Sequence, residues 1–168
     1  LRFEVNENTL IPRPETEELV EWIIESQKSK VKSQKFEILD IGTGTGCIPI
    51  SLKANLPHVN VSAIDVSEKA LEVARRNAVS NKVEINFIQT NILEVEDLSQ
   101  LQTPNFQLPT SFDIIVSNPP YVRNLEKQEI KKNVLDYEPH LALFVEDTDA
   151  LLFYRKIAQL ALKNLAPN

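Results

Sequence analysis

Four consecutive residues, Asn118-Pro119-Pro120-Tyr121, could together hold a planar NH₂ group. Two successive prolines have no backbone N–H, so their carbonyls are left as outward-facing acceptors on a stiff turn. The Asn118 side chain adds an amide oxygen and an NH₂ group, and Tyr121 adds a flat apolar wall with a polar tip. The alternative interpretation is a plain turn followed by a core aromatic residue, and the tetrapeptide alone does not decide between the two.

A glycine-rich segment, Asp40 to Gly46, contains all three glycines of the chain. Glycines concentrated in one loop predict positive φ angles or a very close approach of the backbone to another group. Their G-x-G-x-G spacing differs from the G-x-G-x-x-G spacing that supports a pyrophosphate. The Asp40 carboxylate beside the loop disfavours a phosphate and favours an ammonium group. We therefore expect the loop to bind an amino-acid-like moiety.

A second carboxylate, Asp65, follows the apolar run 59–64. At the end of a second strand, an acidic side chain can accept hydrogen bonds from both hydroxyls of a ribose. The alternative role is a helix N-cap, which Ser67 could fill equally well. A ribose that carries an amino-acid tail and no phosphate describes S-adenosylmethionine, so the two segments favour this cofactor.

Composition restricts the class of protein. A chain of 168 residues with 42% hydrophobic and 25% charged residues is typical of one ordinary globular domain. A net charge of -6 with a pI of about 5.0 argues against a surface that captures nucleic acid, and favours a protein or small-molecule substrate. The single Cys47 cannot form an internal disulfide, and no apolar stretch suits a membrane span or a signal sequence. We expect a cytoplasmic protein without a membrane partner, and the two histidines show no pattern for binding a metal.

Strands and helices are predicted to alternate along the chain. Strands are expected at 36–41, 59–64, 84–88 and 112–116, and helices at 14–28, 46–55, 70–78 and 148–165. A hairpin is expected around residues 2–5 and 9–11, a connector at 26–35, one short helix with a polar loop at 91–109, and a helix at 128–134. This alternation predicts an α/β fold, doubly wound, with a mainly parallel sheet and helices on both faces.

The two ends of the sequence predict that more chain surrounds it. The first residue is Leu1, the chain contains no methionine, and its last helix is followed by Ala166-Pro167-Asn168. We therefore expect sequence to be missing on both sides.

The motifs described above resemble those of a known family. The segments 40–46 and 118–121, together with Asp65, are similar to the motifs of class I S-adenosylmethionine-dependent methyltransferases. The Asn-Pro-Pro-Tyr sequence resembles the version of the motif found in the branch that methylates exocyclic or amide nitrogens. The segments 10–17 and 138–143 resemble those of the peptide chain release factor glutamine N5-methyltransferases. The resemblance covers nearly the whole chain, and the segments follow one another in the family's order.

The resemblance implies a Rossmann-like fold and methyl transfer from S-adenosyl-L-methionine, which becomes S-adenosyl-L-homocysteine. The implied acceptor is the glutamine amide of the Gly-Gly-Gln motif in a peptide chain release factor, with no direct nucleic-acid partner. The implied catalytic residues are Asn118, Pro119 and Tyr121, and the implied substrate-binding residues add Pro120, Arg13 and Glu15. Arg13 and Glu15 could equally serve in helix capping and on a solvated helix face. The implied cofactor-binding residues are Asp40, Gly42, Thr43, Gly44, Thr45, Gly46, Asp65, Asn91, Ile92 and Asn118.

The sequence departs from the family pattern at both ends, because family members carry an N-terminal helical domain and further terminal strands. The resemblance implies that residues 1–35 form a hairpin and a helix that link to a missing N-terminal domain. It also implies that residues 36–168 form the S-adenosylmethionine-dependent methyltransferase domain without its last strands, so that the sheet would expose an edge.

Two further departures from the family pattern and three alternatives are open. Asn91 stands where the family usually has Asp, and an amide oxygen accepts from an adenine amine more weakly than a carboxylate does. Residues 144–148 replace a more glycine-rich stretch. An adenine-N6 methyltransferase acting on DNA or RNA would use the same loop and tetrapeptide, although the acidic balance and the lack of a basic, aromatic-rich tract disfavour it. A second alternative is a non-catalytic S-adenosylmethionine-binding module. The third is an NAD-dependent oxidoreductase, which the spacing of the glycines disfavours.

Overall fold

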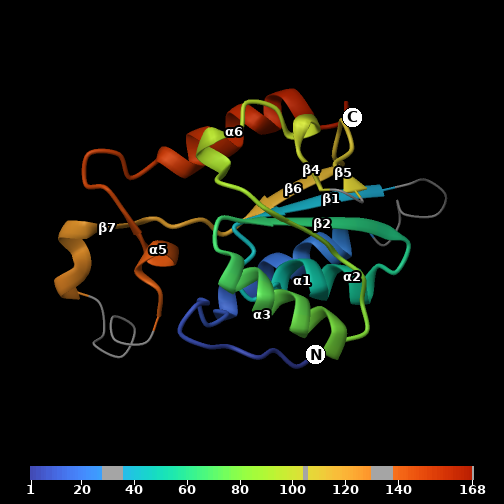
Figure 1. The fold of residues 1–168 in the computed structure, drawn as a ribbon, viewed down its shortest axis with the longest axis horizontal. Helices are drawn as coiled ribbons and strands as arrows, with labels where there is room; N and C mark the ends of the chain where they lie inside the picture. Colours follow the sequence, from blue (N-terminus) through green and yellow to red (C-terminus); the bar gives the residue numbers. More distant parts are fainter. Residues whose placement is uncertain (28–35, 104–105, 130–137, 168) are drawn as a thin grey trace.

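A four-stranded parallel sheet forms the centre of the molecule in the computed structural model, which describes residues 1–27, 36–103, 106–129 and 138–167. The strands lie in the order β3-β2-β1-β6 (Figure 1), with bounds β3 Asn86–Gln89, β2 Val59–Asp65, β1 Phe36–Ile41 and β6 Ile114–Ser117. Strands β2 and β3 lie on one side of β1, whereas β6 lies on its other side. The strand order therefore reverses between β1 and β6, and ligands of such sheets bind at the carboxyl ends of the strands at this point.

Helices cover both faces of this sheet. The helices α1 (Pro14–Gln27), α2 (Cys47–Asn55) and α3 (Glu68–Ser80) lie below the sheet in Figure 1, and α6 (Leu152–Asn164) lies above it. Strand β1 contributes side chains to the hydrophobic core on each face of the sheet. Ile38 packs with residues of α1 and α2 on one face, and Leu39 and Ile41 pack with residues of α6 on the other. The predicted doubly wound α/β fold is confirmed.

The helix starts follow from a few residues at each N-terminus. Pro14 opens α1, and Pro49 is the third residue of α2, where its missing N–H costs no helical hydrogen bond. Ser67 caps α3, because its hydroxyl accepts from the Ala70 N–H at 3.2 Å. The prediction for α1 is confirmed as far as Gln27, since Lys28 and the rest of the connector lie outside the described residues.

Several predicted boundaries are wrong by a few residues. Strand β6 begins at Ile114 rather than at 112, because Phe112 pairs with Leu165 in an isolated bridge. Strand β3 begins at Asn86 rather than at 84, because the preceding residues close α3: Lys82 has a φ of 57°, and the Val83 N–H donates to the Ala78 carbonyl at 3.1 Å. Helix α6 begins at Leu152 rather than at 148, because residues before it form a turn in which Asp149 donates to Glu146 at 3.1 Å.

The segment 91–109 holds more structure than one short helix. It contains two 3₁₀ helices, η1 (Ile92–Glu94) and η2 (Leu98–Gln100), and an antiparallel pair of β4 (Gln102–Thr103) with β5 (Phe106–Gln107). Asn164, buried at the end of α6, anchors the segment: its Oδ1 accepts from the Leu98 N–H at 3.3 Å, and its Nδ2 donates to Asp97 at 3.0 Å. These bonds join residues that are far apart in the sequence, so local patterns did not reveal them.

The predicted N-terminal hairpin is wrong. Residues 1–13 contain no β-strand, and the chain turns where the Thr9 N–H donates to the Asn6 carbonyl at 3.1 Å. The backbone of Arg2 and Glu4 is instead hydrogen-bonded to two asparagine side chains, those of Asn77 in α3 and of Asn81 at its C-cap. Side-chain amides thus supply the partners that a second strand would have offered.

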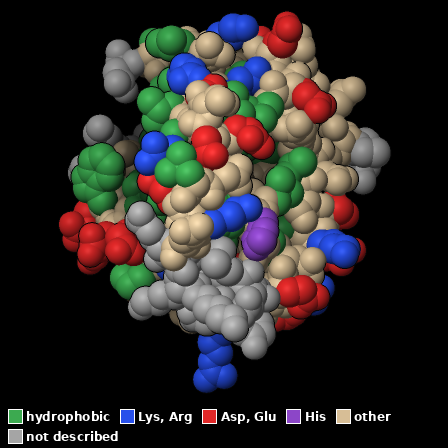
Figure 2. Space-filling view, turned by 90° about the vertical axis from the view of Figure 1, so that its left-hand side faces the viewer, with side chains coloured by type: hydrophobic (Ala, Val, Ile, Leu, Met, Phe, Trp, Pro, Cys, Tyr) green, Lys and Arg blue, Asp and Glu red, His purple; other side chains and the backbone are tan. Residues whose placement is uncertain are grey.

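A small lobe follows the tetrapeptide, at the left of Figure 1. It comprises β7 (Val122–Arg123), η3 (Asn124–Glu129), α5 (His140–Leu143) and β8 (Phe144–Val145), and β7 pairs in parallel with β8. Residues 128 and 129 of the helix expected at 128–134 are in a 3₁₀ helix, and its remaining residues lie outside the described part of the chain. On the face of the molecule that carries this lobe, charged side chains of both signs lie among hydrophobic ones (Figure 2).

Candidate functional site

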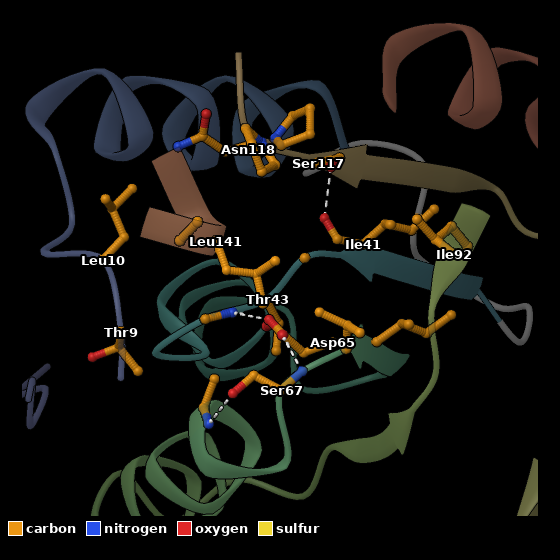
Figure 3. A pocket seen from close by; sticks show the side chains of 18 of the residues that line it. Thr9, Leu10, Ile41, Thr43, Asp65, Ser67, Ile92, Ser117, Asn118 and Leu141 are labelled. Atoms are coloured by element: carbon orange, nitrogen blue, oxygen red, sulfur yellow. Dashed lines mark hydrogen bonds between the residues drawn. The ribbon is translucent and has the colours of Figure 1, made fainter. Parts of the chain in front are cut away.

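A cavity of about 330 Å³ lies at the carboxyl ends of β1, β2 and β6. Its volume is within the range of small-molecule sites. Its walls come from the glycine-rich loop, the ends of β2 and β6, η1, α6, the N-terminal segment and α5 (Figure 3). The cavity thus opens at the reversal of strand order, where ligands of such sheets bind.

The glycine-rich loop connects β1 to α2 and forms the floor of the cavity. Gly42, Gly44 and Gly46 have φ angles of 76°, 55° and 77°, so the predicted positive φ angles are confirmed. A Cβ on Gly46 would lie 3.1 Å from the Cβ of Ala74, which shows how closely the loop packs on α3. Gly42, Thr43, Gly44 and Thr45 line the cavity, whereas Gly46 packs behind it.

Asp65 holds the loop from the end of β2 (Figure 3). One carboxylate oxygen accepts from the Gly44 N–H at 2.8 Å, and the other accepts from the Ser67 N–H at 2.9 Å. The N-cap of α3 is Ser67, so the alternative role for Asp65 does not apply. Burial raises the pKa of Asp65, and the backbone N–H groups of Ser67 and Gly44 limit the rise. Each oxygen keeps a lone pair, and the residue lines the cavity.

Asp40 is fully buried in β1 and does not line the cavity. Within the described part of the chain, neither of its carboxylate oxygens has a hydrogen-bond partner, and the buried Thr43 hydroxyl also lacks one. Burial raises the pKa of Asp40 to about 7; the nearby Thr43 hydroxyl opposes the rise and the Asp65 carboxylate adds to it. Buried polar groups are normally paired, so Asp40 is an unpaired buried acid behind the loop, and Thr43 is an unpaired hydroxyl in the cavity wall.

Asn91 and Ile92 lie on the wall that follows β3. The Asn91 Oδ1 accepts from the Leu93 N–H at 3.1 Å, and its Nδ2 donates to Glu94 at 2.8 Å. Asn91 therefore caps η1, and its amide oxygen keeps one lone pair for a ligand. Ile92 is buried and adds an apolar surface.

The tetrapeptide follows β6 directly. Asn118, Pro119 and Pro120 line the cavity, whereas Tyr121 is 58% exposed and does not. Just before them, the Ser117 hydroxyl donates to the Ile41 carbonyl at 2.6 Å, and the two residues are paired in register (Figure 3). This bond joins the carboxyl ends of β1 and β6, so it fixes the tetrapeptide relative to the loop. No local pattern in the sequence indicated this role of Ser117.

Arg13 is placed away from the cavity, against Glu138. Its guanidinium forms a 2.6 Å ion pair with the Glu138 carboxylate, whose other oxygen accepts from the Ile11 N–H at 3.2 Å. The Glu138 side chain is only 3% exposed. Neither Arg13 nor Glu15 lines the cavity, whereas their neighbours Thr9, Leu10, Pro12 and Thr16 do. Glu138 therefore fixes the wall formed by the N-terminal segment, a role that no local pattern in the sequence indicated.

Replacing Glu138 with Gln is expected to lower the free energy of unfolding by about 1–2 kcal/mol, because a buried carboxylate with two partners is lost while Arg13 remains partly solvated. Urea denaturation measures the change. The matched control is Glu68→Gln, since Glu68 also pairs with an arginine at 2.6 Å but both side chains are about half exposed. The control is expected to change the free energy by less than about 0.5 kcal/mol. Equal changes in the two variants would contradict the structural role of Glu138.

The chain is similar to known methyltransferases. A family model described as "Methyltransferase small domain" matches residues 23–140. A protein of Flavobacterium psychrophilum named release factor glutamine methyltransferase is 65% identical over the whole chain, which covers 55% of that protein. A protein of Bacteroides thetaiotaomicron with the same name is 47% identical over 98% of the chain and 54% of its own length. The chain thus spans about half the length of these relatives.

Solved structures share the fold at low sequence identity. The catalytic domain of hMettl16, solved in complex with the MAT2A 3′UTR hairpin 6, is similar to 96% of this chain and 56% of its own, with a TM-score of 0.64 and 21% identity. Magnesium protoporphyrin IX methyltransferase from Synechocystis PCC 6803, solved with bound SAH, is similar over 88% of this chain and 50% of its own, with a TM-score of 0.53 and 14% identity. These similarities show that the fold is shared.

Proposed function

The chain belongs to the methyltransferase small domain family, and we propose that it transfers a methyl group from S-adenosylmethionine to the glutamine amide of the Gly-Gly-Gln motif in a peptide chain release factor. The relatives at 65% and 47% identity, which are named release factor glutamine methyltransferases, support this substrate. The observation that carries the proposal is the position of Asn118 and Pro119, which line the cavity directly beside the glycine-rich loop.

The residues around the cavity fit S-adenosylmethionine. The lone pairs of Asp65 face the cavity beside the loop, as a ribose requires, and Asn91 with Ile92 offers an acceptor and an apolar surface for adenine. The unpartnered Asp40 beneath the loop supplies a negative charge for the ammonium group. When bound, this cofactor supplies a methyl group on a positively charged sulfur.

An amide nitrogen is a poor nucleophile, because its lone pair is delocalised into the carbonyl. In this proposal, the two N–H groups of the glutamine amide donate to the Asn118 side-chain oxygen and to the Pro119 carbonyl. These two hydrogen bonds aim the amide nitrogen at the methyl group. Orientation of this kind can supply up to about 7–11 kcal/mol of a barrier in favourable cases. Tyr121, exposed in this structure, would close over the amide plane and exclude water when substrate binds.

Binding of the cofactor is expected to weaken as the pH falls from 7 to 5. The pKa of Asp40 is raised to about 7, so below this pH the free protein holds the neutral acid, which does not attract an ammonium group. Affinity should fall by up to about tenfold per pH unit. The free protein should show the opposite trend in stability, because a buried acid with a raised pKa lowers stability as the pH rises from about 4 to 7. Calorimetry at each pH checks both trends, and Asp40→Asn should flatten them.

The substrate is tested by offering labelled S-adenosylmethionine with three acceptors to the protein. These are a release factor bearing Gly-Gly-Gln, the same factor with Gly-Gly-Asn, and an adenine-containing oligonucleotide. We expect label only in the first. Label in the oligonucleotide would instead support adenine methylation, and binding of the cofactor without transfer would support a non-catalytic module.

The charge distribution supports a protein partner rather than a nucleic acid. Acidic and basic side chains are interspersed on the described part of the face around β7 and α5 (Figure 2), whereas phosphate-binding surfaces are strongly basic. No helix in the described residues is both long and apolar enough to cross a membrane.

A further inference from the structure

The buried side chain of Asn77 contacts both the glycine-rich loop and the N-terminal segment. It lies in α3 and is 1% exposed. Its Nδ2 donates to the carbonyl oxygens of Thr45 at 2.9 Å and of Glu4 at 3.0 Å, and its Oδ1 accepts from the Glu4 N–H at 2.7 Å. Asn77 does not line the cavity, so it reaches the cofactor site only through the loop.

Asn81, one helical turn later, binds Arg2 in the same manner. The Arg2 N–H donates to Asn81 Oδ1 at 3.2 Å, and Asn81 Nδ2 donates to the Arg2 carbonyl at 2.7 Å. Four residues of helix advance about 6 Å, and two residues of extended chain advance about 6.6 Å. The two asparagines therefore match alternate residues of the N-terminal segment. They pair with it as the edge of a neighbouring strand would.

Asn77 differs from Asn81 in its contact with Thr45. Thr45 is 2% exposed and lies between two glycines with positive φ. A buried carbonyl without a donor is costly, and Asn77 supplies that donor. Ala74, three residues earlier on the same helix face, packs against Gly46. Helix α3 therefore fixes the peptide between Thr45 and Gly46 from behind, and rotation of this peptide would displace Gly44 and Thr45 in the cavity wall.

We propose that Asn77 is a positioning residue for the cofactor, which couples the docking of residues 2–4 to the shape of the glycine-rich loop. The identity of the cofactor rests on the function proposed above. A docked N-terminal segment holds the Asn77 amide in the orientation that binds the Thr45 carbonyl, so the segment and the cofactor favour the same loop conformation.

The test compares Asn77→Asp with Asn81→Asp. Both variants add one negative charge at the C-terminal end of α3, and both replace an NH₂ donor by an acceptor. Asn81→Asp removes the donor to the carbonyl oxygens of Arg2 and Asn77, whereas only Asn77→Asp removes the donor to the Thr45 carbonyl. Asn77→Asp is expected to weaken S-adenosylhomocysteine binding at least about tenfold, the cost of one unsatisfied buried carbonyl. Asn81→Asp is expected to stay within about twofold. In turnover assays Asn77→Asp should raise the KM for S-adenosylmethionine while kcat at saturation stays within about threefold.

Amide hydrogen exchange of Gly44 and Gly46 gives a readout that needs no ligand. Exchange is expected to be at least about tenfold faster in Asn77→Asp and unchanged in Asn81→Asp. If Asn77→Asp does not fold, Asn77→Ala, which removes the donor without adding a charge, is judged by the same criteria. Exchange rates that are equal in the two variants, or equal affinities, would overturn the inference. A wild-type protein that binds S-adenosylhomocysteine but methylates no glutamine would overturn the proposed function alone, and the affinities and exchange rates of the variants would still decide this inference.

Discussion

Replacing Asn118 with Ala is expected to lower kcat for glutamine methylation by at least about a hundredfold, while affinity for S-adenosylhomocysteine stays within about threefold. The Asn118 oxygen is assigned to one N–H of the amide, so its loss removes one of the two acceptors that aim the nitrogen. The loop, Asp65 and η1, which are assigned to the cofactor, are untouched. Steady-state kinetics and calorimetry measure the two quantities.

The control for Asn118→Ala is Asn55→Ala. Asn55 is exposed at the end of α2, where its side chain donates to the Ser51 carbonyl at 2.9 Å, and it does not line the cavity. It tests whether loss of any asparagine amide lowers turnover through stability. An equal loss of turnover and cofactor affinity in Asn118→Ala would show that this residue serves the cofactor rather than the amide.

Replacing Asp65 with Ala is expected to weaken cofactor binding at least about a hundredfold, because two effects combine. The ribose loses both of its proposed acceptors, and the N–H groups of Gly44 and Ser67 lose the carboxylate that holds them. Turnover at saturating cofactor should fall much less, since the tetrapeptide remains anchored through Ser117. Calorimetry with S-adenosylhomocysteine measures the first effect, and kcat at saturation measures the second.

Asp113→Ala is the matched control for Asp65→Ala. Asp113 also accepts from a backbone N–H, that of Glu37 at 2.8 Å, but at the amino end of the sheet. It is expected to leave affinity unchanged. If Asp65→Ala altered only turnover and left affinity intact, the ribose assignment would be wrong.

The parts of the fold that could be predicted are those with strong local patterns. The apolar run of β1 followed by three glycines specified a strand, a loop and a helix, because Gly42, Gly44 and Gly46 all need positive φ angles. The same holds for Ser67, whose hydroxyl could be expected to cap α3. Asp65 and Asn118 could be placed near the site because each directly follows such a strand.

The parts that could not be predicted depend on contacts between distant residues. Glu138 lies 125 residues from Arg13, and Asn77 lies 73 residues from Glu4, yet each pair is hydrogen-bonded. Before the structure, these polar side chains matched a solvated surface as well as a buried contact. The N-terminal segment showed the alternation of a strand, and its partners turned out to be side chains on a helix. The division of the chain at residue 35 stays a prediction.

The central claim is that Asn118 and Pro119 hold the glutamine amide, and a crystal structure with S-adenosylhomocysteine and a Gly-Gly-Gln peptide tests it most directly. We predict that the glutamine nitrogen lies about 2.8–3.1 Å from both the Asn118 Oδ1 and the Pro119 carbonyl oxygen, on the side that faces the cofactor sulfur. An amide nitrogen bound by other groups, or a glutamine outside the cavity, would contradict the account.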